Sequence, residues 1–232
     1  MAIMKKKEKG LFIVLDGTDG SGKATQARLL LGRLKKAGYG FEKIDFPQYG
    51  KKSAALVEEY LNGVFGTAEE VGPYRASIFY ACDRYAASVK IKKWLSEGKI
   101  VVCDRYVTAN MGHQGGKIKN KRERNKYYKW LHDLEYNIFS IPKPDVNIIL
   151  HVDAAVAQKM VNPDEKRGYI KAGKRDIHES DLKHLQNAEK AYLEIAKNFP
   201  DISLIECMKK GVIVSKDEVS DLVWEKIRER LS

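Results

Sequence analysis

Cysteine is scarce in this chain of 232 residues, and its three copies are spread along the sequence. Cys82, Cys103 and Cys207 show none of the close pairwise spacings of metal-binding cysteines. Their odd number and wide separation also argue against a disulfide-stapled scaffold. We therefore expect free thiols in a reducing compartment, which indicates a cytoplasmic protein.

Long apolar runs are lacking as well. Residues 1–10 are basic, but the apolar run that follows, residues 11–15, is too short for the core of a signal peptide. No segment approaches the length that crosses a bilayer. The sequence therefore predicts a protein that does not associate with a membrane.

Acidic side chains are outnumbered: 31 aspartates and glutamates stand against 42 lysines and arginines, which leaves a formal net charge of +11. This excess suits anionic ligands such as nucleotides, and it could also suit nucleic acid. The basic residues are dispersed, however, which favours general solubility. The length and a hydrophobic content of 44% predict a single globular domain, residues 1–232.

The strongest chemical signal is a glycine-rich turn between the apolar run and a helical pattern. Glycines let successive N–H groups point at one anion, and the helix adds the positive end of its dipole. Gly-x-x-x-x-Gly-Lys in this context predicts a phosphate-binding loop for ATP; a turn without a ligand is the alternative. The predicted loop residues are Gly17, Thr18, Asp19, Gly20, Ser21, Gly22, Lys23, Ala24 and Thr25.

One loop position departs from the motif. Ala24 stands where a serine or threonine hydroxyl usually meets Mg²⁺. Mg²⁺ is largely satisfied by phosphate oxygens and water, so losing one hydroxyl need not abolish metal binding.

Strands and helices are expected to alternate along the chain. The expected strands are residues 11–15, 41–46, 100–103, 146–152 and 202–205, and the helices after the loop helix are residues 53–61, 73–98, 130–139, 154–161, 182–199 and 216–231. This alternation predicts an α/β fold with a five-stranded parallel sheet covered on both faces. Ligands collect at the carboxyl ends of such strands, so residues 16–23 and 104–106 are expected to face one pocket.

Two charged stretches lie between the expected elements. Residues 117–128 are interpreted as a solvated connection into the next helix, with nucleic-acid contact as the alternative. Residues 162–178 combine glycine, proline and basic side chains and are interpreted as a mobile lid.

Four motifs follow one another in order: residues 17–26 (Gly-Thr-Asp-Gly-Ser-Gly-Lys-Ala-Thr-Gln), Phe46-Pro47, residues 80–84 (Tyr-Ala-Cys-Asp-Arg) and residues 104–106 (Asp-Arg-Tyr). In this order they resemble the thymidylate kinase family, which transfers a phosphoryl group from ATP to dTMP. The resemblance covers about residues 11–207. It implies a P-loop NTPase-type three-layer α/β/α fold, a basic lid, Mg²⁺ and a homodimer.

The resemblance also implies roles for individual residues. Lys23 and the loop backbone would hold the ATP phosphates, and Arg105 would grip the acceptor phosphate. Asp104 would organise Mg²⁺, and Asp19 would bind the 3′-hydroxyl of the acceptor. The remaining implied residues are Phe46, Pro47, Tyr80, Arg84 and Gln114 around the acceptor, and Arg167 and Arg175 as catalytic cations of the lid.

Several of these side chains have a structural alternative. Tyr80 could be plain core, and Arg84 could pair with an acid on a solvated helix face. Asp104 could merely cap the next helix. His113 is interpreted as a packing residue rather than a base, because phosphoryl transfer depends mainly on positioning.

Three other functions compete with the dTMP kinase. The first is another nucleoside monophosphate kinase, and the second is a catalytically silent nucleotide-binding protein, as the loss of the hydroxyl at Ala24 would allow. The third is nucleic-acid binding through residues 117–126. We rank all three below the kinase.

Overall fold

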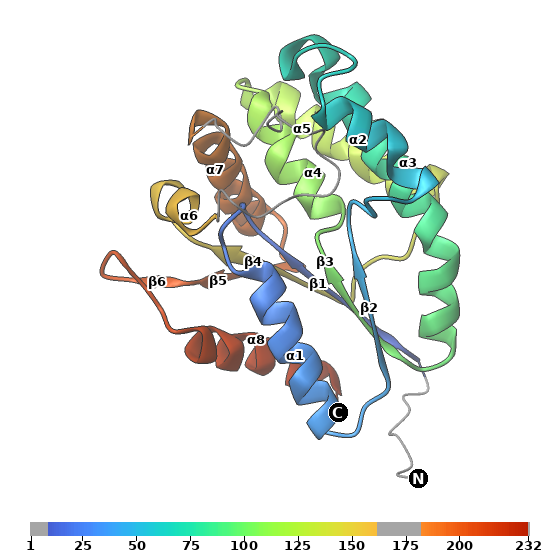
Figure 1. The fold of residues 1–232 in the computed structure, drawn as a ribbon, viewed down its shortest axis with the longest axis vertical. Helices are drawn as coiled ribbons and strands as arrows, with labels where there is room; N and C mark the ends of the chain where they lie inside the picture. The colour runs from blue at the N-terminus through green and yellow to red at the C-terminus, as the bar shows by residue number, and fades with distance from the viewer. Residues whose placement is uncertain (1–8, 162–181, 232) are drawn as a thin grey trace.

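The structure is a computed structural model that describes residues 9–161 and 182–231. Its five-stranded parallel sheet has the order β2-β3-β1-β4-β5 (Figure 1). The strands are β1 (Leu11–Asp16), β2 (Phe41–Asp45), β3 (Ile100–Asp104), β4 (Val146–His151) and β5 (Ile202–Glu206). The expected α/β fold is confirmed, with all five expected strands in one sheet.

Helices cover both faces of this sheet. They are α1 (Lys23–Lys36), α2 (Ala55–Leu61), α3 (Ala68–Ser96), α4 (Val107–His113), α5 (Lys121–His132), α6 (Ala154–Met160), α7 (Leu182–Asn198) and α8 (Lys216–Leu231). Figure 1 shows α1 and α8 on one side of the sheet and α3, α4, α5 and α7 on the other.

The central strand β1 explains the layering. Its six residues are all buried, and successive side chains point to opposite faces of the sheet. Ile13 and Leu15 join the core formed with α1 and α8, whereas Phe12 and Val14 join the core formed with α3, α4, α5 and α7. A strand buried on both faces reads as one continuous apolar run, as this one does.

The charged stretch 117–128 corrects one expectation. Most of it is helix rather than a connection, since α5 begins at Lys121. The side chain of Asn120 caps the helix by accepting hydrogen bonds from the backbone N–H groups of Arg122 (2.9 Å) and Glu123 (3.1 Å). Tyr127 and Tyr128 bury the opposite face.

Other element bounds also differ from the expectation. The long helix α3 starts before Pro73, at Ala68, with a capping box of Thr67 and Glu70, and it is interrupted at Gly72 (φ 72°, ψ 166°). The expected helix 130–139 is the end of α5 followed by a π-helical turn, Asp133–Ile138. A short antiparallel pair, β6 (Met208–Lys209) and β7 (Val212–Ile213), was not expected.

Two further findings concern a membrane span and the expected lid. Among the described residues, no helix combines the length and the apolar character that a membrane crossing needs. The expected lid, with Arg167 and Arg175, falls outside the described residues.

Candidate functional site

The glycine-rich loop runs from the end of β1 to the start of α1, as the sequence predicts. Gly17, Gly20 and Gly22 all have positive φ, at 139°, 81° and 84°. A Cβ on Gly17 would lie 2.4 Å from the carbonyl oxygen of Leu150, and one on Gly20 would lie 2.0 Å from that of Ala157. Glycine is therefore required at these two positions by both conformation and space.

Two hydroxyl groups of this loop are available to hydrogen-bond a ligand. Thr18 Oγ1 and Ser21 Oγ are buried and have no hydrogen-bond partner within the described part of the chain. Buried polar atoms are normally paired, and unpaired ones call for an explanation. A bound anion that accepts from the loop supplies one.

Lys23 is folded back over the loop. Its side chain is only 6% exposed, and its Nζ donates to the carbonyl oxygen of Thr18 at 2.6 Å. Burial, followed by repulsion from Arg105, lowers the pKa of Lys23 to about 8. The ammonium therefore lacks full compensation for its burial, which an anionic ligand would provide.

Arg105 faces the same loop from the neighbouring strand β3. Leu15 of β1 is in register with Asp104, and the backbone N–H of Arg105 donates to the Leu15 carbonyl at 2.9 Å. The guanidinium of Arg105 pairs with the carboxylate of Asp19. The expectation that residues 16–23 and 104–106 meet at one edge of the sheet is confirmed.

Arg105 has a backbone φ of 64°, in the left-handed region that non-glycine residues rarely adopt. Such outliers concentrate at ligand clamps and active sites, where the surrounding structure sustains the strain. The side chain of this strained residue is the one that pairs with Asp19.

Asp16 is a site residue that sequence reasoning placed at a strand end without giving it a role. It is fully buried and accepts hydrogen bonds from the N–H of Gly17 (2.8 Å) and the hydroxyl of Tyr192 (2.7 Å). Burial raises the pKa of Asp16, although Arg105, Tyr192, Gly17 and Lys23 oppose the rise. Asp16 thus links the loop to α7. No local sequence pattern predicts its hydrogen bond with Tyr192.

The Phe46-Pro47 motif lies beside β3. The N–H of Phe46 donates to the carbonyl of Asp104 at 3.0 Å, and the Phe46–Pro47 bond is cis. Asp83 of α3, which is buried, then accepts from the N–H of Gln48 (2.8 Å) and the hydroxyl of Ser53 (2.6 Å). The segment after the motif is therefore fixed to α3.

Arg84 does not lie on a solvated helix face, which was the structural alternative for this residue. It is 1% exposed, and its Nε and Nη2 both donate to Oε1 of Glu135, the Nε bond measuring 2.9 Å. Glu135 comes from the π-helical turn Asp133–Ile138, so the pair joins two elements 51 positions apart. The solvated-face alternative is wrong, because burying an arginine requires a carboxylate buried with it.

Tyr80 and Gln114 were also expected near the acceptor. Tyr80 lies edge-on to Tyr60 with ring centroids 6.4 Å apart, against the small cluster that α2 and α3 form. Gln114 is 2% exposed, and within the described residues its Oε1 has no hydrogen-bond partner. Gln114 thus keeps a buried acceptor available.

The side chains beside the loop include oxygen atoms that could bind a metal ion. Asp104, half-buried at the end of β3, offers a carboxylate next to the loop. Within the described residues, no group of three or more acidic, histidine or cysteine side chains is arranged so that it could hold a metal ion by itself. Mg²⁺ in phosphate-transfer sites needs only one or two carboxylates beside substrate oxygens and water, so these residues fit it. Ala24 is exposed and supplies no ligand.

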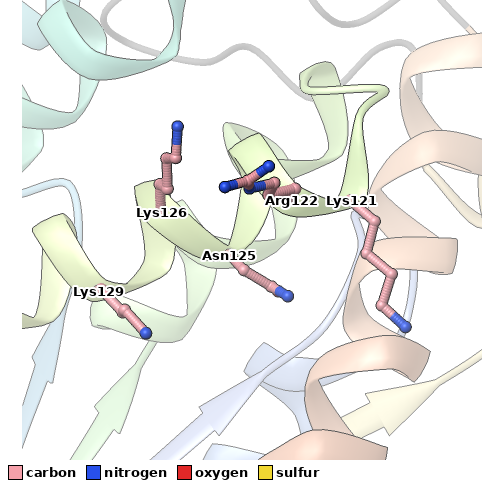
Figure 2. Close-up of a pocket in the computed structure, with 5 residues that line it drawn as sticks. All are labelled: Lys121, Arg122, Asn125, Lys126 and Lys129. Carbon is pink, nitrogen blue, oxygen red and sulfur yellow. The ribbon is translucent and has the colours of Figure 1, made fainter.

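A second basic region lies on α5. A hollow of about 610 Å³ is lined by Lys121, Arg122, Asn125, Lys126 and Lys129. Figure 2 shows that these side chains diverge, with Lys126 and Lys121 extending to opposite sides of the helix. They come from a single helix and do not converge on one point, in contrast with Lys23 and Arg105.

Known proteins match this chain over most of its length. The thymidylate kinase family model matches residues 15–219. A thymidylate kinase of Mycobacterium tuberculosis (strain CDC 1551 / Oshkosh) is 29% identical over 187 residues, covering 80% of this chain and 86% of that protein. A probable thymidylate kinase of Thermococcus kodakarensis is 31% identical over 209 residues, covering 86% of this chain and 90% of that protein.

The fold itself also has a solved counterpart. The structure of thymidylate kinase from Candida albicans superposes with a TM-score of 0.72, covering 96% of this chain and 92% of that chain at 23% identity. This agreement shows a shared fold.

Proposed function

Because the chain belongs to the thymidylate kinase family, we propose that it transfers the γ-phosphoryl group of ATP to dTMP to give dTDP. One observation carries the proposal: two cations, Lys23 at the start of α1 and Arg105 directly after β3, are brought to the same glycine-rich loop. One cation serves each of two phosphate groups that would otherwise repel each other.

The donor side consists of the loop. The backbone N–H groups of residues 17–25 and the dipole of α1 would hold the ATP phosphates. Lys23 would leave the Thr18 carbonyl and move onto the terminal phosphates. Its burial supports this role, because an electrostatic contact strengthens where water is excluded.

The acceptor side consists of Arg105 and Asp19. In the structure they pair with each other. When dTMP binds, Arg105 would hold its phosphate and Asp19 its 3′-hydroxyl. Phe46 and Pro47 would line the same side of the acceptor, where contacts to Asp104 and Asp83 fix the segment.

The base would be read by three residues. Tyr80 would stack on thymine, and the free Oε1 of Gln114 would accept a hydrogen bond from the base. Arg84 would reach a base carbonyl while Glu135 neutralises its charge, since a guanidinium has five donors and Glu135 takes two.

Mg²⁺ would be held by Asp104, directly or through water. When bound, it neutralises charge on the transferred phosphates. A water would fill the position that the Ala24 methyl leaves without a ligand.

The chain's own residues would do the rest of the work. Lys23 and Arg105 would align donor and acceptor, and alignment supplies much of the rate in reactions that need no covalent participation. Arg167 and Arg175 are proposed to add positive charge to the transferred phosphoryl group and to help exclude water.

A panel of acceptors tests the activity. Purified protein with ATP and Mg²⁺ is given each deoxy- and ribonucleoside monophosphate in turn, and the diphosphate product is measured. We expect dTMP to give the highest kcat/KM. A higher value for dCMP or AMP would overturn the base assignment, and no transfer to any acceptor would favour the catalytically silent alternative.

A homodimer in the cytoplasm is also proposed. The helix α3 carries four exposed large apolar side chains, Tyr74 (40% exposed), Ile78 (41%), Tyr85 (53%) and Val89 (73%), at the four- and seven-residue steps of a helix–helix seam. Val89→Glu should therefore convert a dimer to a monomer in sedimentation velocity. A wild type that sediments as a monomer would refute the dimer.

The three thiols, all free in the structure, suit a reducing compartment.

A further inference from the structure

Two histidines continue inward from the acceptor-side arginine. Arg105 Nη1 lies 3.1 Å from His113 Nε2 at the end of α4. His113 Nδ1 lies 3.3 Å from His184 Nε2 on α7. The two rings are stacked with centroids 5.5 Å apart. Arg105, His113 and His184 thus form one chain of hydrogen bonds, and this chain links α4 to α7.

The chemistry of these groups fixes every proton in the chain. A guanidinium only donates, so His113 Nε2 must present its lone pair to Arg105. His113 therefore carries its proton on Nδ1 and donates it to His184. His184 Nε2 must in turn be the unprotonated nitrogen. Protonating either ring would place two N–H groups against each other.

We propose that His113 is a positioning residue whose tautomer, set by His184, holds the guanidinium of Arg105 toward the acceptor phosphate. This inference rests on the proposed function for the identity of the acceptor. It assigns to His113 a role beyond packing.

The close approach of α4 and α7 supports the arrangement. A Cβ on Gly112 would lie 2.4 Å from Cζ of Tyr192, so glycine is what allows α4 to reach α7 here. Tyr192 meets the His113 ring edge-on at 5.7 Å. Its hydroxyl donates to Asp16, which ties the same contact to the phosphate loop.

The electrostatic surroundings keep His113 neutral. Burial, then repulsion from Arg105 and from His184, lowers the pKa of His113 well below its usual value. Asp19 opposes this effect but is already paired with Arg105. Among the described residues, the ionisable groups that face His113 include Arg105, His184, Asp19, Lys23 and Tyr192.

A neutral hydrogen-bond acceptor has a specific advantage beside Arg105. A carboxylate would cancel the charge that Arg105 needs for the phosphate, whereas a neutral imidazole fixes the direction of the guanidinium and leaves its charge available. Asp19 is bound from the other side and is expected to turn to the acceptor sugar.

Three variants test the role. His113→Leu removes the acceptor, and His113→Gln restores it, because the Gln carbonyl can accept from Arg105 while its amide donates to His184. His132→Gln makes the same change on the exposed end of α5 and is the matched control. Calorimetry measures the Kd for dTMP in the nucleotide-free protein, and steady-state kinetics measure KM and kcat.

For His113→Leu we expect the Kd and KM for dTMP to rise about tenfold, with the KM for ATP changed less than about twofold. His113→Gln should recover to within about threefold of wild type, and His132→Gln should match wild type. Equal effects of Leu and Gln, or an unchanged dTMP affinity in His113→Leu, would overturn the proposal.

A second measurement does not depend on turnover or on a folded variant. In wild-type protein labelled with ¹⁵N-histidine, NMR reports which ring nitrogen carries the proton. We expect His113 to be neutral with Nδ1 protonated from about pH 8 to about pH 6, where a free histidine titrates. A protonated Nε2 or a cationic ring would overturn the assignment. Binding of dTMP without transfer would refute the proposed function alone.

Discussion

The two basic regions of the molecule hold their cations in different ways. Lys23 and Arg105 are at least partly buried, and each is held by a named acceptor, the Thr18 carbonyl or the Asp19 carboxylate. On α5 the side chains of Lys121, Arg122, Lys126 and Lys129 are exposed, and Lys126 forms a surface ion pair with Glu123 in which the two side chains are 59% and 52% exposed.

The difference shows that charge number alone does not build a phosphate site. Exposed ion pairs contribute little because water screens them and their side chains lose entropy. A buried, directed cation acts in a medium of lower dielectric constant, where water screens its attraction for a phosphate less.

Lys23→Met should have the largest effect. We expect kcat for transfer to dTMP to fall about a thousandfold, because the mobile cation at the terminal phosphates is lost. Lys126→Met removes the same charge from α5 and should change kcat less than about twofold.

The stability of the Lys23→Met variant separates lost function from lost fold. The pKa of Lys23 is lowered in the folded state, so its burial as a cation costs stability at pH 7. Chemical denaturation should therefore show a free energy of unfolding higher by about 1 to 3 kcal/mol. A destabilised variant would mean that the lysine is a structural element of the loop.

Asp104→Ala should have the next largest effect. We expect about a hundredfold loss in kcat/KM, with a higher Mg²⁺ requirement for ATP binding measured by calorimetry, because the only carboxylate proposed to anchor the ion is removed. Ala24→Ser should change activity only modestly. A silent wild type that Ala24→Ser activates would favour the nucleotide-binding protein without catalysis.

The pKa of Lys23 predicts a smaller and reversible effect, a pH dependence of ATP binding. Only the protonated lysine attracts phosphate, and its pKa is about 8 in the free protein. The Kd for ATP should therefore rise about tenfold between about pH 7 and about pH 9 in calorimetric titrations. Lys23→Arg, which does not titrate in this range, should show no such rise. A parallel rise in that variant would exclude Lys23 as the titrating group.

Local sequence patterns predicted the parts of the site that depend on local chemistry. The run ending at Asp16 and the loop to Lys23 follow from apolar burial and glycine conformations. The meeting of this loop with Arg105 follows from parallel strands, whose carboxyl ends share one edge.

Long-range partners could not be predicted in the same way. Arg84 and Glu135 are 51 positions apart, and Asp16 and Tyr192 are 176 apart. No short pattern marks such a pair, because any buried acid or base on the right face would serve. The bond between His113 and His184 likewise depends on how closely α4 and α7 pack.

Neutralising the α5 face should have the smallest effect. We change Lys121, Arg122, Lys126 and Lys129 together to Gln. At about 0.15 M salt the Debye length is about 8 Å, so exposed charges act only on their near surroundings. We expect kcat/KM for dTMP to stay within about twofold of wild type under these conditions.

Low salt provides the sharper comparison for this variant. At about 0.01 M ionic strength the Debye length grows to about 30 Å, and the α5 charges should then assist the encounter with nucleotides. The variant should therefore lose part of kcat/KM at low salt only, with kcat unchanged. A loss at physiological salt as large as that of Lys23→Met would show that α5 belongs to the phosphate site. Salt-sensitive binding of wild type to single-stranded DNA that this variant lacks would instead support the nucleic-acid alternative.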